Sequence, residues 1–420
     1  MDHPILTTFL LITGFALALI AQWRGWRPSL RMALGVGIGL RLVLLIIAAG
    51  SDWQPVDFVQ SFRPAGEAIL ARQDPILTTD GAWRFLPMIP YVYALPLGLG
   101  IPWEISGRLV TVVADIVLIV LVGKLAAGGG TDDKAAGREA LARFQYACNP
   151  LALMVAVIHA QLEPVSLVFL VGAYLAARSG RGWYAGVLFG LALSAKSWPI
   201  ILLPVLLAML PTWRLRAQAF VMAGAVPVLF LLSLPLGAGT PLSKLREISQ
   251  VLGWVRPIVG EWGWTAMMTG GEWALVPAFS KYGQMVLYAT LLVVMIAWWR
   301  SDKVDTTTAM LLAFMLVTPR LGAQYLLWFV PFLIARPTRF GQAALASAAL
   351  WAGLGYIYLT QYVDYDWWWR HRWWAQASLL VIPVLGAAIP WERRRRLRRS
   401  AEKEEPPVEA PGEPPVGALR

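Results

Sequence analysis

Long apolar runs constrain the fold of this chain more than any other feature. Runs such as PILTTFLLITGFALALIA (4–21) and LVTVVADIVLIVLVG (109–123) recur along the sequence. A helix needs roughly 20 apolar residues to cross a bilayer, and about a dozen segments approach that length. Hydrophobic residues make up 58% of the chain and charged residues only 15%. The sequence therefore predicts an all-α, polytopic integral membrane protein, whose first run is a span and not a signal peptide.

The basic residues predict the direction of these spans. The net charge is +11, but the positive residues lie in short clusters between apolar runs. Such clusters are typical of cytoplasmic loops, so they indicate a plasma membrane protein and no nucleic-acid partner. QWRGWRPSLR (22–31) and ERRRRLRRS (392–400) are the clearest examples. When these basic loops are placed inside and successive spans cross in opposite directions, the chain makes about thirteen crossings. The N-terminus is then outside and the C-terminus cytoplasmic.

Two segments do not cross in this prediction. Residues 86–100 would begin and end on the outer side, and they carry Pro87, Pro90 and Pro96. Because proline interrupts helix hydrogen bonding, we expect an interfacial or re-entrant piece there. Residues 392–420 are first basic and then rich in proline and glutamate, which predicts a disordered cytoplasmic tail. Residues 1–391 form the membrane-embedded domain.

Residue types that hold cofactors are scarce. One cysteine, Cys148, excludes an internal disulfide and a thiolate metal cluster, and the three histidines lie far apart. The sequence contains no phosphate-cradling glycine loop, so it predicts no direct use of ATP. We therefore predict no cofactor and no metal-ligand set, and the sequence leaves a divalent metal requirement open.

Unusual polar residues gather on the predicted outer face. A charge at the centre of a bilayer costs about 2.5–3.5 kcal/mol, so such positions are informative. The candidates for a substrate site there are Asp52, Asp57, Arg63, Arg84, His159, Gln161, Glu163, Lys196, Arg320 and Gln324. Asn149, in an Asn-Pro pair inside the preceding span, is a further candidate, either as a hydrogen-bonding amide or as a packing kink.

Asp57 is the strongest candidate for catalysis. It lies just outside a span and precedes a stretch whose apolar spacing predicts an amphipathic helix. A carboxylate at the rim of the bilayer is well placed as a general base. The alternative is that Asp57 only caps the helix that follows.

The other candidates also have two interpretations. HAQLEP (159–164) could bind sugar hydroxyls or a phosphate, or it could be an ordinary turn. Lys196 and Arg320 are single cations at outer span ends. Each could hold a phosphate, or could extend toward lipid headgroups.

The order of the motifs resembles a known family. VDFVQSFRPAGEAILARQDPI, RFLPMIPYVYALPLGL, RFQYACNPLALMVAVIHAQLEPVSLVFLV, LALSAKSWPIILLPV and TPRLGAQYLLWFVPFL follow one another from about residue 50 to residue 331. This order is similar to that of polytopic glycosyltransferases with the C-type fold, which use polyprenyl-phosphate sugars. The nearest branch is glycosyltransferase family 87, the bacterial α-mannosyltransferases.

The resemblance implies roles for several residues. Asp57 matches the catalytic base in the first outer loop, and Lys196 matches a lysine that precedes a proline. RFLP (84–87), Asn149 with Pro150, and Arg320 match further motif positions. His159, Gln161 and Glu163 stand where the family often has Gly-Gln or Gly-Asn, so the sugar specificity stays open.

The resemblance also implies a reaction. An inverting transfer would move a sugar, with mannose suggested by the family, from a polyprenyl-phosphate donor to a lipid or glycan acceptor on the outer face. Asp57 would take the proton of the acceptor hydroxyl, and Lys196 and Arg320 would stabilise the leaving phosphate. Two alternatives remain. One is a transporter or flippase, supported by Asp115 within a span, and the other is a scaffold that does not need Asp57.

Overall fold

The computed structural model describes residues 3–253, 260–272, 276–362 and 371–394. Most of the basic run and the tail predicted for 392–420 therefore lie outside the described residues. Within them the fold is helical, and the extended pairing recorded is a single bridge between Glu261 and Arg320. The longer helices are α1 (Pro4–Trp23), α2 (Leu30–Ala49), α5 (Trp103–Ala127), α6 (Asp133–Ala147), α8 (Glu163–Arg178), α9 (Gly182–Ala195), α11 (Trp213–Gly237), α14 (Pro277–Ala297), α15 (Lys303–Val317), α17 (Gly341–Gly353) and α19 (Arg372–Ala387).

Shorter helical segments connect these. They are η1 (Phe58–Phe62), α3 (Arg63–Leu70), α4 (Met88–Gly98), α7 (Pro150–Leu153), η2 (Met154–Ile158), η3 (Trp198–Leu202), α10 (Leu203–Met209), η4 (Leu242–Lys244), α12 (Leu245–Gly253), α13 (Trp264–Thr269), η5 (Ala323–Leu327), α16 (Val330–Ala335) and η6 (Leu354–Tyr362).

The prediction of an all-α, multi-pass membrane protein is confirmed. In the described ranges, seven helices are long and apolar enough to cross a bilayer, or eight if α6 and the segment Pro150–Ile158, bent by 45°, form one span. The count of about thirteen is not confirmed, because several predicted spans form shorter helices. α15, for example, has 15 residues, where a span needs roughly 20. α4 has 11 residues, fewer than a crossing requires.

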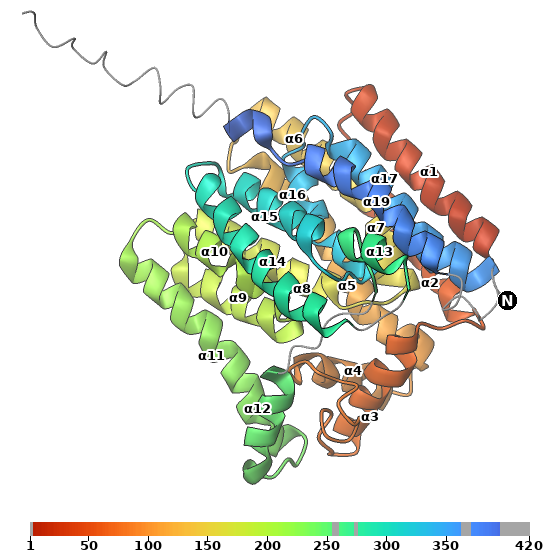
Figure 1. Ribbon diagram of the computed structural model, residues 1–420, viewed down its shortest axis with the longest axis vertical. Helices are drawn as coiled ribbons and strands as arrows, with labels where there is room; N and C mark the ends of the chain where they lie inside the picture. Colours follow the sequence, from red (N-terminus) through yellow and green to blue (C-terminus); the bar gives the residue numbers. More distant parts are fainter. Residues whose placement is uncertain (1–2, 254–259, 273–275, 363–370, 395–420) are drawn as a thin grey trace, which may run out of the picture.

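The long helices pack into one bundle with a continuous apolar core (Figure 1). α9 and α11 approach closely because α9 presents glycines at positions 182, 186 and 190. A Cβ on Gly186 would lie 2.5 Å from a backbone oxygen of α11. Small residues allow helix backbones to approach this closely inside membranes, where apolar burial between helices gives little gain.

A fully buried polar cluster lies inside the bundle. Arg41 of α2 donates through Nε and Nη2 to one oxygen of Asp115 of α5, at 2.8 and 2.6 Å. The hydroxyl of Tyr146 donates to the other carboxylate oxygen at 2.6 Å. The two charged side chains have no exposed surface. The cluster therefore neutralises Asp115 internally and ties three helices together.

A second, smaller core lies at one end of the bundle. Figure 1 shows α3, α4 and α12 together at this end. We call the unit formed by η1, α3, α4, the connection 71–87 and α12 the end module. Phe58, Phe62, Trp83 and Tyr93 form its aromatic centre, and Ile248 of α12 is buried in the same cluster. Asp74 joins the module to the segment after α11, because the Thr240 hydroxyl donates to it at 2.6 Å. The end module is thus packed onto the bundle by its own apolar core.

Candidate functional site

Asp57 lies where α2 passes into the end module. It precedes η1 and α3, whose buried side includes Phe58 and Phe62. The amphipathic helix predicted after Asp57 is therefore present. The Asp57 side chain is exposed and makes no capping hydrogen bond to that helix. Its Oδ2 atom instead accepts a hydrogen bond of 3.2 Å from the Gln161 side-chain amide. The capping interpretation does not describe this carboxylate.

The segment after η2 brings the predicted HAQLEP residues to Asp57. Gln161 Nε2 lies 3.2 Å from Asp57 Oδ2 and also 3.2 Å from Nδ1 of His159. The ring of His159 stacks on Tyr356 with 4.0 Å between ring centroids, and Trp53 packs nearby at 5.8 Å. Burial, together with the charge of Arg108, lowers the pKa of His159 to about 3. The imidazole is therefore neutral at physiological pH.

Tyr356 links the cluster to the C-terminal part of the chain. Its hydroxyl donates to Gln324 Oε1 at 3.1 Å. Gln324 is the second residue of η5, and the next residue, Tyr325, is buried. The carboxylates of Asp57 and Glu163 both lie within electrostatic range of the Tyr325 and Tyr356 hydroxyls. Segments far apart in sequence thus share one site.

Lys196 and Glu163 form a buried ion pair at the same place. Lys196 Nζ donates to Glu163 Oε1 at 2.5 Å, and the Glu163 side chain is fully buried. The ammonium lies 5.6 Å from the ring centroid of Phe85 in the end module and 5.4 Å from that of Tyr325 in the bundle. Glu163 Oε2 is buried without a hydrogen-bond partner among the described side chains and backbone. The pair therefore spans the junction between the two cores.

Arg320 is buried and lies just before η5, the segment that contains Gln324. Its Nη2 lies 3.9 Å from Glu261 Oε1, and both side chains are less than a tenth exposed. The backbone of Leu321 also donates to the Gly260 carbonyl at 3.2 Å, which holds the two segments together. Both cations predicted to meet a phosphate are therefore close to a carboxylate.

Four predicted site residues have other surroundings. Arg63 is exposed on α3 and pairs with Glu67 one turn later. Asn149 is buried, and its side chain accepts from the Ala152 amide, so it caps the helix that follows the bend. Arg84 donates to the Gly81 carbonyl at 2.5 Å, and Asp52 is exposed after α2.

Sequence reasoning did not select Tyr356, Trp53 or Arg108. Arg108 is 1% exposed and donates to the Val157 carbonyl at 2.9 Å and to Gln54 at 2.8 Å. The sequence signal that could have identified Arg108 is its place as a cation at the start of the apolar run 109–123. Tyr356 lies in the middle of an apolar segment, where nothing in the local sequence distinguishes it.

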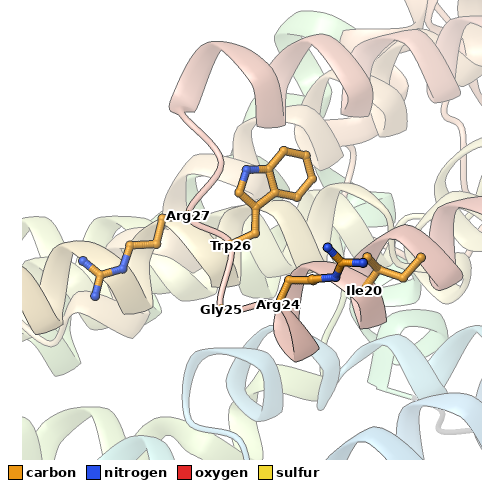
Figure 2. A pocket seen from close by; sticks show the side chains of 5 residues that line it. All are labelled: Ile20, Arg24, Gly25, Trp26 and Arg27. Carbon is orange, nitrogen blue, oxygen red and sulfur yellow. The ribbon is translucent and has the colours of Figure 1, made fainter.

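Two open surface hollows lie at the other end of the bundle. One is lined by Ile20, Arg24, Gly25, Trp26 and Arg27, between α1 and α2 (Figure 2). In Figure 2 the side chains of Arg24 and Arg27 extend in opposite directions. This loop lies at the start of α2, whereas Asp57 follows its end. The second hollow lies between Trp183 and Trp213, at the starts of α9 and α11. Neither hollow is lined by a carboxylate.

Comparison with known proteins assigns the family. No curated protein sequence matches the chain. The sequence profile of glycosyltransferase family 87 matches residues 87–319, more than half of the chain. The match includes HAQLEP and Lys196, begins after Asp57 and ends immediately before Arg320. With its helical membrane fold, the chain is a member of glycosyltransferase family 87.

Proposed function

We propose that this glycosyltransferase moves a sugar, with mannose the first candidate, from a polyprenyl-phosphate donor to a lipid or glycan acceptor, with inversion at the anomeric carbon. The observation that carries the proposal is the placement of Asp57. It is an exposed carboxylate held by the amide of Gln161, in a cluster that also contains the pair Glu163–Lys196. An exposed, oriented carboxylate beside buried polar groups is suited to general base catalysis.

The reaction needs one proton acceptor and one site for growing negative charge. Asp57 takes the proton from the acceptor hydroxyl as its oxygen attacks the anomeric carbon. The bond from that carbon to the phosphate oxygen breaks, and its electron pair leaves with the lipid phosphate. The phosphate gains one negative charge as it changes from a diester to a monoester.

Lys196 is the proposed partner of that charge. An ammonium has three donors, and Glu163 accepts one of them. Lys196 can therefore donate to a phosphate oxygen while it keeps Glu163. Arg320 is proposed as a second phosphate contact. Stabilising the charge that develops on a leaving group is often the largest catalytic contribution.

We place this chemistry on the outer face of the plasma membrane. The support is the positive-inside pattern, because the basic loop 22–31 precedes α2 and Asp57 follows it. The competing transporter proposal rested on Asp115. In the structure Asp115 is paired with Arg41 and bonded to Tyr146, so it has a structural partner for its charge.

The test is a transfer assay with purified protein. Polyprenyl-phosphate mannose serves as the donor probe and octyl α-mannoside as the acceptor probe. Asp57→Asn should lower kcat by about 10²–10⁴-fold, because the amide cannot take a proton. Glu67→Gln, an exposed acid of the same module, is the matched control and should retain activity. Wild-type rates in Asp57→Asn would refute the assignment of the base.

A further inference from the structure

The turn between His159 and Gln161 has an unusual backbone. Ala160 lies there with φ of 49°, in the left-handed region, and is fully buried. This conformation is unfavourable for a residue that carries a Cβ. The His159 and Gln161 amides donate to Met154 and Val155 carbonyls, each at 2.9 Å, which holds the turn closed. Strained residues persist where the surrounding structure enforces them, and they cluster at functional sites.

The strained turn changes the directions of its two neighbours. Side chains at positions i and i+2 of a regular helix do not face each other. Here the left-handed Ala160 brings the side chains of His159 and Gln161 within 3.2 Å. The same Gln161 nitrogen lies 3.2 Å from Asp57. An amide nitrogen carries two hydrogens, so one can reach each acceptor.

The tautomer of the His159 ring decides whether the nitrogen or the oxygen of the Gln161 side-chain amide faces it. Nδ1 of His159 accepts a hydrogen only when that nitrogen is unprotonated. The ring stacks on Tyr356, and Arg108, buried nearby, disfavours a second positive charge. In the neutral tautomer that carries its proton on Nε2, Nδ1 of His159 accepts from the amide nitrogen of Gln161, 3.2 Å away. This leaves the second N–H directed at Asp57.

We propose that Gln161 is a positioning residue, whose amide is aimed by the strained turn at Ala160 and by Nδ1 of His159, and which holds the Asp57 carboxylate in place for proton abstraction. This inference rests on the proposed function, in which Asp57 is the base. Gln161 itself needs no contact with the reacting atoms. Its effect is to keep the carboxylate oriented by donating a hydrogen bond to Oδ2.

The experiment measures kcat and KM for the donor with the same two probes. Gln161→Leu removes the donor, and Gln161→Glu keeps the shape and polarity but cannot donate when ionised. His159→Phe keeps a ring for Tyr356 but offers no acceptor. Gln145→Leu is the matched control, because Gln145 is a buried glutamine bonded to Gln22 and not to the site.

We expect Gln161→Leu, Gln161→Glu and His159→Phe each to lower kcat by about 10–100-fold, since a misplaced catalytic group costs about that much. KM for the donor should stay within about twofold. Gln145→Leu should retain kcat, because its bond to Gln22 lies outside the site.

The outcomes separate this inference from the proposed function. An unchanged kcat in both Gln161 variants, with Asp57→Asn inactive, would overturn the positioning role and leave Asp57 as the base. Should Gln161→Leu not fold, Gln161→Glu alone decides. Full activity of Asp57→Asn would remove the proposed base and this inference with it. A loss of folded protein without a loss of kcat would show that Gln161 is structural only.

Discussion

Breaking the ion pair between Arg41 and Asp115 is a perturbation whose cost can be worked out from the structure. Both side chains are fully buried, and two hydrogen bonds join them. Asp115→Leu leaves a buried guanidinium without its counter-charge, which costs about 3–5 kcal/mol. It also leaves the Tyr146 hydroxyl without its acceptor, which costs about 1–3 kcal/mol more. The single variant should therefore lose a large part of its stability.

The triple variant Arg41→Met, Asp115→Leu, Tyr146→Phe should recover most of that loss. Replacing a whole buried ion pair by apolar residues of similar volume is often neutral. We expect its free energy of unfolding to lie within about 2 kcal/mol of wild type. Unfolding in mixed micelles with a denaturing detergent, followed by tryptophan fluorescence, measures both values. The reasoning is refuted when Asp115→Leu costs less than about 1 kcal/mol, or when the triple variant is no more stable than the single one.

The same triple variant also tests function, because it should retain sugar transfer if Asp115 is structural. A transporter that couples substrate movement to Asp115 would lose its activity.

Three further predictions concern sidedness, pH and packing. Cys148 is buried, so a membrane-impermeant thiol reagent should label Glu67→Cys in intact cells but Lys134→Cys only after permeabilisation; the reverse pattern would contradict the outer placement. Because the pKa of His159 is lowered to about 3, the unfolded chain gains a proton below about pH 6.5 that the folded protein does not. Unfolding free energy should therefore fall between about pH 6.5 and 4, by at most about 1.4 kcal/mol per pH unit, and less steeply in His159→Gln; equal slopes would refute this. Gly186→Ala should lower the melting temperature in detergent, because its Cβ would meet α11 backbone at 2.5 Å; an unchanged melting temperature would show that the helices can separate at no cost.

Several features could be predicted from local sequence because the bilayer restricts the choices. Backbone groups in lipid must be bonded within a helix, so apolar run length alone predicts helical spans. The helix after Asp57 and the short segment around Pro90 also follow from local pattern. The number of crossings does not follow, because α15 is apolar but short. Burial among protein neighbours and burial in lipid give the same sequence signal.

The candidate site was also predictable only in part. Asp57, Gln161 and Lys196 were selectable because polar residues at the ends of apolar runs are costly unless they have a partner or a role. Their pairing was not predictable: Glu163 pairs with Lys196, and Tyr356 stacks on His159 from a segment nearly 200 residues later in the chain. Asn149 differs, because its side-chain oxygen caps a helix through the backbone amide of Ala152, which is close in sequence.

The sequence by itself thus determined that the chain is a helical membrane protein, and its motif order pointed to glycosyltransferase family 87. The reason is that apolar run length, proline and loop charge act locally and need no knowledge of neighbours. Only the tertiary structure decided that Asp57 is held by Gln161, that Lys196 is already paired, and that Asp115 is neutralised by Arg41. Those facts depend on contacts between distant segments, and the close packing of the bundle is what brings them together.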